Sequence, residues 1–370
     1  MEIKMSIVYV PCIKNGMNDI KALLNLKEES SGYVMPLVLT AGTPYGGNGV
    51  DLKKDYLLDE FIHNWDKPFI VDASRADSDS ESLYNSYHNL TSQHDNFSGK
   101  ITYYSSIYSI NKKLIPAISW QLNDDMRNIV QLSLYLEQQY EKIAIIIDPN
   151  NSKNLNRLDT LLCLFKDNSR IIVLLNYNSI YNKELPQEHK VLPVISKLTS
   201  RGVGSIVLLS SSFPPVKPAI KDTWIQSENT DLLWQLTMMN KSPRDSVILY
   251  GDYSATSPNS ATEYIQGMQI IPSVTYFRGG IWYQIKSGVD KEFSKYKDIA
   301  NELIRLDFFH GSTFCWGAEN IYDIATNRDR KGGTPGTWNG YKINVHVEET
   351  IRILKDYYST PLENYDEDSE

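Results

Sequence analysis

Cysteine and histidine are scarce in this 370-residue chain. The three cysteines, Cys12, Cys163 and Cys315, lie far apart in the sequence. Isolated cysteines make neither a disulfide framework nor a zinc motif, and they suit a reducing compartment. The six histidines contain no His-Glu-x-x-His, and the one His-x-Glu, which begins at His346, has no Cys-x-x-Cys after it. We therefore expect neither a transition-metal site nor a bound cofactor.

Long apolar runs and an excess of basic residues are also missing. The sequence contains no uncharged apolar stretch near the ~18 residues that a membrane helix needs. Its first residues lack the basic segment, apolar stretch and cleavage site of an export signal. The net charge is −8 and the pI about 5.4, whereas nucleic-acid-binding proteins carry basic stripes. These absences predict a soluble, cytoplasmic protein that enters no membrane and does not bind nucleic acid directly.

Short apolar runs alternate with helical patterns along most of the chain. Each run is nearly continuous, which is typical of strands that are covered on both faces of a parallel sheet. The alternation of strands and helices favours an α/β fold, and eight repeats over about 250 residues have the usual size of a closed (β/α)8 barrel. We predict this TIM-like barrel, with strands at 5–13, 35–39, 68–71, 114–118, 142–147, 170–175, 204–209 and 246–250.

An open, doubly wound sheet is the alternative architecture. Such sheets usually have fewer strands and a glycine-rich first turn. The first turn here reads Lys14-Asn15-Gly16-Met17 and contains no G-x-G-x-x-G, which favours the barrel. The helices expected between the strands lie at 18–26, 52–65, 81–90, 125–140, 155–165, 191–201 and 230–239.

Two parts of the chain depart from this alternation. Residues 92–111 are polar and rich in tyrosine, and we interpret them as an additional strand. Residues 254–345 form a long excursion after the eighth strand. In order, it is predicted to contain a hairpin of 270–277 and 281–286 around Arg278-Gly279-Gly280, a helix at 291–306 and a loop at 327–340. The prediction is thus one barrel domain over 1–358, closed by a helix at 347–357, and an acidic tail at 359–370.

A polar residue follows each predicted strand within two positions, and active sites of closed barrels gather at these C-terminal strand ends. These positions are Lys14, Thr40, Asp72, Ser119, Asp148, Asn176, Ser210 and Asp252. Every strand must leave the barrel into water, which by itself explains polar exits. A ring of carboxylates with a lysine could also run acid–base chemistry, hold Mg²⁺ or form an ion-paired plug. We take Lys14, Asp72 and Asp252 as catalytic candidates, and His346 as a general base or a structural histidine.

A second group of residues has the chemistry of a binding surface. Ser211 and Ser212 follow the seventh strand, where hydroxyls and free amides could bind an anion or where the prolines after them simply lock a turn. Arg278 lies among aromatic residues of the hairpin, where it could clamp a phosphate, carboxylate or peptide, or pack on the surface. The candidate ligand- or partner-binding residues are Ser211, Ser212, Tyr253, Tyr276, Arg278 and Trp282.

Short motifs spread along the chain carry a family resemblance. They are Tyr9-x-Pro11-x-x-Lys14 with Ala22-Leu23, Met35-Pro36-Leu37, Ser211-Ser212-Phe213-Pro214, Gly251-Asp252-Tyr253, Tyr276-x-Arg278-Gly279-x-x-Trp282, Cys315-Trp316-Gly317 and the stretch from Trp338 to His346. In their order and spacing they resemble the beta protein family of satellite bacteriophages and bacterial defence islands. Residues 80–200 match that family poorly.

The resemblance implies a role in phage defence and brings no established catalytic residues with it. In the satellite-phage setting of that family, the beta protein is encoded beside a host-killing protein and restrains it. The resemblance therefore implies the control component of a toxin–antitoxin-like cassette, with a protein partner encoded nearby. Family members often carry a glutamate where strand two ends, but this chain reads Leu39-Thr40 there. Any chemistry that needed that acid is thereby in doubt.

Three functions remain open at this point. A regulatory barrel that recognises a partner protein is favoured by the resemblance and by the aromatic hairpin. A hydrolase, or an enzyme of a phosphorylated or nucleotide-like molecule, is favoured by the polar ring and the serine turn. A sugar hydrolase would need two of Asp72, Asp148 and Asp252 about 5–10 Å apart. The barrel hosts many unrelated functions, so the neighbouring genes would separate these hypotheses better than the fold.

Overall fold

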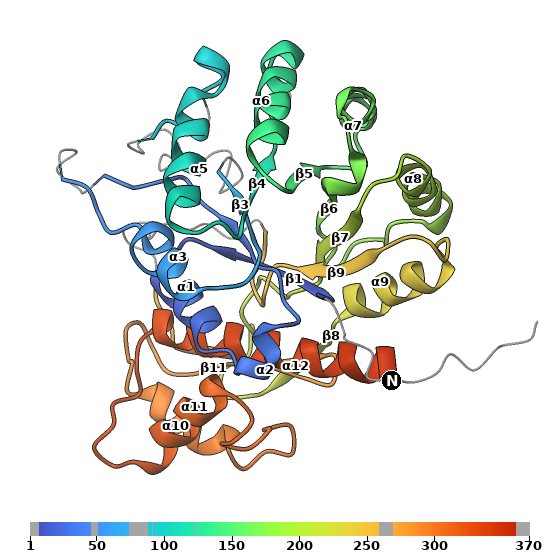
Figure 1. Cartoon of the computed structure of the whole chain (residues 1–370). Coiled ribbons are helices and arrows are strands. Elements are labelled where there is room, and N and C mark those ends of the chain that lie inside the picture. Colours follow the sequence, from blue (N-terminus) through green and yellow to red (C-terminus); the bar gives the residue numbers. More distant parts are fainter. Residues whose placement is uncertain are drawn as a thin grey trace, which may run out of the picture.

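Eight apolar segments form parallel strands that close into a barrel, as the sequence predicts (Figure 1). The computed structural model describes residues 7–45, 51–73, 88–90, 92–121, 123–258 and 269–359. The barrel strands are paired in chain order, and the last of them pairs with the first. They are β1 Tyr9–Lys14, β2 Leu37–Leu39, β3 Phe69–Asp72, β4 Leu114–Ile118, β5 Ile143–Ile147, β6 Ile171–Ser179, β7 Ser205–Ser211 and β9 Ile248–Asp252.

Both faces of these strands are buried, which explains their continuous apolar sequences. Alternate residues, such as Val10, Ile70 and Ile146, pack together inside the barrel. The residues between them, such as Val71 and Ile145, pack outward against the helices. Because side chains alternate along a strand, this division also fixes which strand-end residues point into the barrel mouth.

Helices cover the outer face of the strands (Figure 1). Side-chain caps begin three of them: Asp125 accepts the N–H of Arg127, Asn151 accepts the N–H of Lys153, and Asn229 accepts the N–H of Leu232. The helices up to β9 are α1 Met17–Leu24, α2 Glu28–Ser31, a π-helical turn at Leu57–Phe61 that continues into α3 Ile62–Asn64, α5 Ser98–Ile110, α6 Met126–Gln139, α7 Ser152–Leu164, α8 Glu188–Ser200 and α9 Thr230–Lys241, with 3₁₀ turns at His94–Asn96 and Asn168–Arg170.

The additional strand predicted at 92–111 is wrong, because most of this segment is helix α5. Tyr103, Tyr104 and Ile107 fall three and four residues apart and are fully buried, so the aromatic residues follow a helical period. Their β-forming composition hid that spacing. Of the helix predicted at 81–90, residues 81–87 lie outside the described part, as do residues 360–370 of the predicted acidic tail.

The excursion after β9 forms a small antiparallel sheet and two helices. The predicted hairpin is confirmed as β10 Ser273–Arg278 and β11 Ile281–Lys286, which turn at Gly279 and Gly280. Both glycines have a positive φ, the conformation that glycine adopts most readily. A third strand that the sequence pattern did not predict, β8 Ile225–Glu228, precedes β9 in the chain and pairs with β11. Helices α10 Lys295–Leu303 and α11 Trp316–Thr326 follow.

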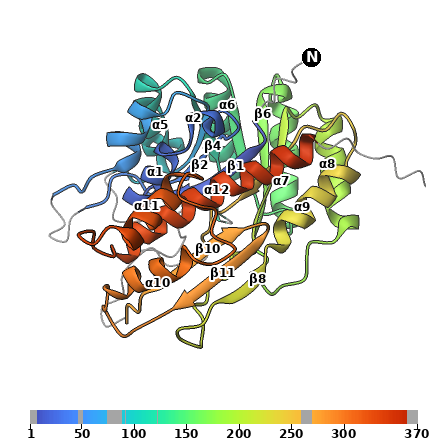
Figure 2. The same cartoon turned by 90° about the horizontal axis from the view of Figure 1, so that it is seen from below.

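Helix α12, Pro335–Ser359, lies between the barrel and the excursion (Figures 1 and 2). It packs on α1 at one side and on β10 and α11 at the other. The sequence predicted a loop to residue 340 and a helix only from 347, whereas the helix begins at Pro335, because proline is well tolerated in a first helical turn. Within the described ranges, no helix is both long and apolar enough to span a membrane.

The contact between α11 and α12 depends on Gly317. A Cβ at this position would lie 2.6 Å from the carbonyl oxygen of Tyr341 and 3.2 Å from its Cα. We predict that Gly317→Ala lowers the free energy of unfolding by about 1–3 kcal/mol, because the backbones of two packed helices must separate. Urea denaturation measures this. Gly32→Ala is the matched control, since nothing lies within 4 Å of its Cβ position, and an equal loss in both variants would contradict the prediction.

Candidate functional site at the barrel mouth

The alternation of side chains places some of the predicted residues inside the barrel mouth. Lys14, Asp72, Ser119, Asp148 and Asn176 each follow an inward-facing residue by two positions, so they point into the mouth. Tyr253 belongs to the interior cluster itself. Lys14 and Asp148 are partly exposed, whereas Asp72 is fully buried. The mouth therefore contains one lysine and two of the predicted carboxylates.

Hydrogen bonds connect several of these inward-facing residues. Ser119 Oγ donates to a carboxylate oxygen of Asp72 at 2.6 Å. The hydroxyl of Tyr253 donates to Asn176 Oδ1 at 2.8 Å. The charge of Asp72 also acts on Lys100 of α5, a buried lysine that the sequence analysis missed. Burial lowers the pKa of Lys100, while the charges of Asp72 and Asp124 raise it. The buried end of the mouth is thus a polar layer whose charges are set by tertiary packing.

Asp252 lies on the other face of the barrel wall. It is one residue out of phase with the inward positions, and it contacts Tyr9 and Tyr250, whose rings belong to the outer core. Their hydroxyls donate to its carboxylate at 2.5 Å and 3.1 Å. His346 of α12 approaches the same carboxylate, with Nε2 2.6 Å from Oδ2. The predicted catalytic residues Asp252 and His346 are therefore brought together, but away from Lys14 and Asp72.

The environment of the Asp252–His346 pair is closed. Asp252 is 3% and His346 1% exposed, and the imidazole is stacked on Trp282 with its centroid 4.8 Å away. Burial raises the pKa of Asp252, but the charge and hydrogen bond of His346 and the hydroxyl of Tyr9 outweigh it and hold the pKa below the ordinary value. The nearby Asp231 has a pKa raised to about 6, by burial and by the charge of Asp252. This network fastens α12 to the barrel.

The serine turn is also internally satisfied. Ser211 Oγ donates to the carbonyl of Thr256 at 3.1 Å and accepts the N–H of Phe213 at 3.2 Å. Ser212 Oγ lies 2.8 Å from Asn229 Oδ1 and contacts Asp231, so it faces α9 instead of the mouth. These hydroxyls hold the turn after β7 in place. The segment is thus closer to the alternative of a rigid turn than to that of an anion site.

The predicted hairpin residues hold the excursion together. The Arg278 guanidinium donates to the carbonyls of Asp307 and Phe309 at 2.6 Å and 3.0 Å. Tyr276 and Trp282 are 1% and 2% exposed, so neither offers its ring to a partner. The hydroxyl of Tyr276 lies 2.7 Å from Nδ1 of His310, whose Nε2 lies 3.0 Å from a carboxylate oxygen of Glu349 of α12. These residues occupy the interface between the hairpin and α12.

Two further charged residues at the mouth were missed by the sequence analysis. Asp19 of α1 and Lys342 of α12 come close together where these helices pack. Neither follows a predicted strand, so strand-end reasoning could not find them. No three or more potential metal-ligating side chains gather at one point in the described part of the chain. The mouth is thus a mixed-charge site formed by β-strand ends, α1 and α12.

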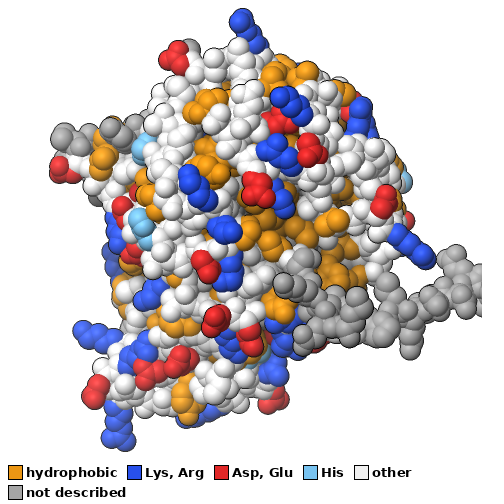
Figure 3. Space-filling view, in the orientation of Figure 1, with side chains coloured by type: hydrophobic (Ala, Val, Ile, Leu, Met, Phe, Trp, Pro, Cys, Tyr) orange, Lys and Arg blue, Asp and Glu red, His pale blue; other side chains and the backbone are white. Residues whose placement is uncertain are grey.

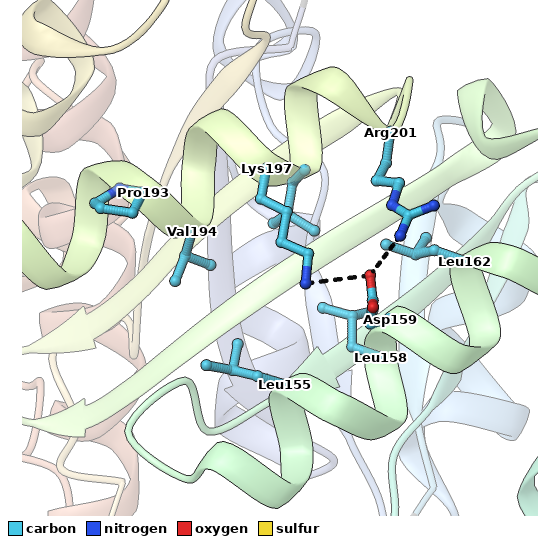
Figure 4. A pocket seen from close by; sticks show the side chains of 9 residues that line it. Leu155, Leu158, Asp159, Leu162, Pro193, Val194, Lys197 and Arg201 are labelled. Carbon is cyan, nitrogen blue, oxygen red and sulfur yellow. Dashed lines mark hydrogen bonds and ion pairs between the residues drawn. The ribbon is translucent and has the colours of Figure 1, made fainter.

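An apolar hollow lies on the surface outside the mouth. It has a volume of about 190 Å³ and lies between α7 and α8, where Leu158, Leu162 and Val194 line it (Figure 4). Asp159 pairs with Lys197 and Arg201 at its rim. None of the strand-end residues reaches it. On the face seen in Figure 3, acidic and basic side chains are intermixed.

Asp252 and the neighbouring Asp231 are predicted to change the stability with pH in opposite directions. Asp252→Asn should lower the free energy of unfolding by about 3–5 kcal/mol near pH 7, since it leaves His346 without its buried partner. Because the folded-state pKa of Asp252 is depressed, this contribution is complete above about pH 4 and is lost as the pH falls through the lowered pKa. The difference in the free energy of unfolding between the wild type and Asp252→Asn should therefore decrease at acidic pH.

Asp231→Asn is the matched control for this pH dependence. The pKa of Asp231 is raised to about 6, so the folded chain binds the extra proton and the wild type loses stability as the pH rises from about 4 to 6. The free energy of unfolding of the wild type, measured relative to that of Asp231→Asn, should therefore decrease as the pH rises from about 4 to 6. Urea denaturation between pH 3 and pH 7 measures both curves, and two curves of the same slope would contradict the assignment.

Comparison with known proteins agrees with the motifs found in the sequence. The family described as Beta protein matches residues 9–352. The chain is also similar to the Protein beta of Enterobacteria phage P4, with 22% identity over 352 residues in an alignment that covers 93% of each chain. The matched region runs from β1 into α12, so it includes the whole barrel and the excursion. This chain therefore belongs to the Beta protein family, whose phage P4 member makes it a phage-related protein.

Proposed function

We propose that this protein is the control component of a phage-defence cassette in the bacterial cytoplasm, where it restrains a toxin-like partner encoded nearby. The observation that carries the proposal is the match to a phage protein along almost the entire chain. Such coverage includes the mouth, α12 and the excursion together. The match therefore does not by itself separate these surfaces, and the geometry favours the mouth.

The barrel mouth is the favoured contact surface because its charged side chains are partly exposed and stand on the rigid strands of the barrel. Lys14 and Asp148 stand at the ends of β1 and β5 and are partly exposed. By contrast, Tyr276 and Trp282 are buried, and Arg278 is held by backbone carbonyls. Charged groups on a fixed frame give specificity and register to a protein contact. The partner is therefore expected to present complementary charges to the mouth.

Because the Asp252–His346 pair is buried, it favours a binding function of the barrel over a catalytic one. A general base must come within hydrogen-bond reach of the substrate proton. His346 is 1% exposed and stacked on Trp282, behind the wall that lines the mouth. The pair also cannot combine with Asp72 across that wall, so a sugar hydrolase would have to use Asp72 and Asp148. These features support a binding function for the barrel.

Charge reversal at the mouth tests this function. The chain would be co-expressed with the product of the adjacent gene, and colony formation measured. We predict that the wild type restores viability and that Lys14→Glu and Asp148→Lys do not, because each places like charges across the contact. Lys197→Glu on the outer wall is the control, since its exposed ion pair with Asp159 contributes little to stability. The proposal fails if the adjacent product is harmless, or if the mouth variants fold and still restore growth.

An enzyme of a phosphorylated or nucleotide-like molecule, or a hydrolase, is the second candidate. The observation that favours it is the Ser119–Asp72 hydrogen bond at the buried end of the mouth, beside a lysine whose pKa burial lowers. Such an arrangement is typical of acid–base sites.

Asp72→Asn separates the two functions. Under the regulatory function, the variant keeps both partner capture and restraint, because Asp72 is buried beneath the contact surface. Under the enzymatic function, it captures the partner but loses restraint by about 100-fold or more, since one proton-transfer group is removed. Co-purification and colony counts measure the two properties, and circular dichroism verifies folding. Loss of restraint with capture intact would overturn the regulatory proposal.

A further inference from the structure

Strand β8 forms one edge of the small antiparallel sheet. The sheet has the order β10-β11-β8, so β8 is bonded to β11 along one side. The opposite edge strand, β10, packs against α12. Three of the four residues of β8 are exposed, and Figure 2 shows this strand at the outer margin of the sheet. In the described part of the chain, no strand pairs with that margin.

The hydrogen-bonding phase of the sheet shows which groups of β8 point outward. Asn229 donates its N–H to the carbonyl of Gly280 at 2.8 Å, which continues the β8–β11 register by one residue. Hydrogen-bonded and non-hydrogen-bonded pairs alternate along two antiparallel strands. Ser227 therefore bonds to β11, whereas Gln226 and Glu228 direct their N–H and C=O groups away from it. The outer margin of β8 thus presents the backbone donors and acceptors of these two residues.

The sequence of β8 carries little that protects such an edge. Natural edge strands are protected by proline, lysine, bulges or short length. Strand β8 is short and ends in Glu228, but it contains neither proline nor lysine, and its register with β11 has no bulge. The side chains of Gln226 and Glu228 form no hydrogen bond or ion pair with another described residue. Both their backbone and their side-chain groups are therefore available to a further strand.

The edge is complementary to itself about a two-fold axis. When two copies of β8 lie antiparallel with the axis at Ser227, Gln226 of each copy stands opposite Glu228 of the other. Both residues point their backbone groups outward, so each of these pairs exchanges both N–H···O bonds. On the same face of the sheet, the amide of Gln226 can donate to the carboxylate of Glu228. Ser227 meets its own copy in a closely spaced pair, where a small side chain fits.

We propose that β8 is a dimer interface, through which a second copy of this chain extends the three-stranded sheet into one continuous antiparallel sheet. The complementarity of Gln226 and Glu228 favours a second copy over another protein, because one strand supplies both halves of each contact. A two-fold contact of this kind closes on itself and leaves no free β8 edge. The inference goes beyond restraint of a partner, since it concerns a contact between copies of this chain alone.

Sedimentation velocity of the full chain measures the association. Because a contact through one short strand is small, we expect dimers of twice 42.3 kDa at about 100 µM protein and dissociation on dilution to about 1 µM. Gln226→Pro should weaken the association by about tenfold or more, since it removes an outward N–H, and it should fold because edge strands tolerate proline at such positions. Gln226→Ala is the matched control, because it keeps the backbone donor and should weaken association severalfold at most.

Disulfide formation tests where the two-fold axis lies, and it does not depend on the proline variant. In a Cys163→Ser background, which removes the exposed native thiol, Ser227→Cys should give a covalent dimer under mild oxidation. The Cβ atoms of directly opposed residues lie only ~4.5–5.5 Å apart, which small backbone shifts bring within disulfide range. Ile225→Cys on the same face is the control, since its two copies would be separated by about 13 Å along the strands. Non-reducing electrophoresis measures both.

Three results would overturn the proposal. They are a wild type that stays monomeric at about 100 µM, a dimer that Gln226→Pro leaves unchanged, and equal cross-linking of Ser227→Cys and Ile225→Cys. Circular dichroism verifies that each variant folds. Association is measured on the purified chain alone, whereas restraint of a partner is measured by colony counts, so failure of one result is distinguishable from failure of the other.

Discussion

The pairing of β9 with β1 closes the barrel, and the positions of the candidate residues at the strand ends follow from that closure. Tyr9 pairs with Tyr250 and Pro11 with Asp252 along this seam. On the other side of β9, Gly251 allows a close approach to β7, because a Cβ there would lie 2.7 Å from Val207 and 2.9 Å from the carbonyl of Leu208. A closed ring leaves no unpaired strand edge. It also turns all parallel strand ends toward one opening, where polar side chains from distant parts of the sequence meet.

Helix α12 connects the barrel to the excursion through its side chains. On successive turns it extends Lys342 to the mouth, His346 to the barrel wall and Glu349 to the hairpin. Glu349 accepts the N–H of Gly279 at 2.8 Å, and its side chain is fully buried. Burial raises its pKa, but Arg352, His310 and that N–H outweigh burial and hold the pKa at about 2. Any shift of α12 would therefore move the mouth, the seam and the hairpin together.

The end of β2, where the family resemblance implies a glutamate, carries no acid in this chain. Strand β2 ends in Leu39-Thr40, and Thr40 Oγ1 accepts a hydrogen bond from Asn15 at 3.1 Å. Asn15 also donates to the buried carboxylate of Asp55 at 2.7 Å. A carboxylate is thus present beside the end of β2, but it comes from the segment that follows this strand.

Sequence patterns predicted the barrel because burial on both faces leaves a direct record, a continuous apolar run, in each strand. The hairpin was predictable for a local reason as well, since Gly279 and Gly280 adopt a backbone conformation that few other residues tolerate. Helix α5 was missed because β-forming tyrosines occupy its buried face, and β8 was missed because β11, the strand with which it pairs, lies more than fifty residues away.

Local sequence thus determined the fold class, the strand positions and the polar strand ends. It also named Asp252 and His346, whose contact the structure then revealed. Only the tertiary structure decided which face of the wall each side chain occupies: Asp72 lies inside, while Asp252, at the end of β9, lies outside. A shift of one residue along a strand reverses the face, and the polarity of a residue does not encode that shift. The proximity of Lys342 and Asp19 likewise arises from helix packing between chain segments more than three hundred residues apart, which no local pattern records.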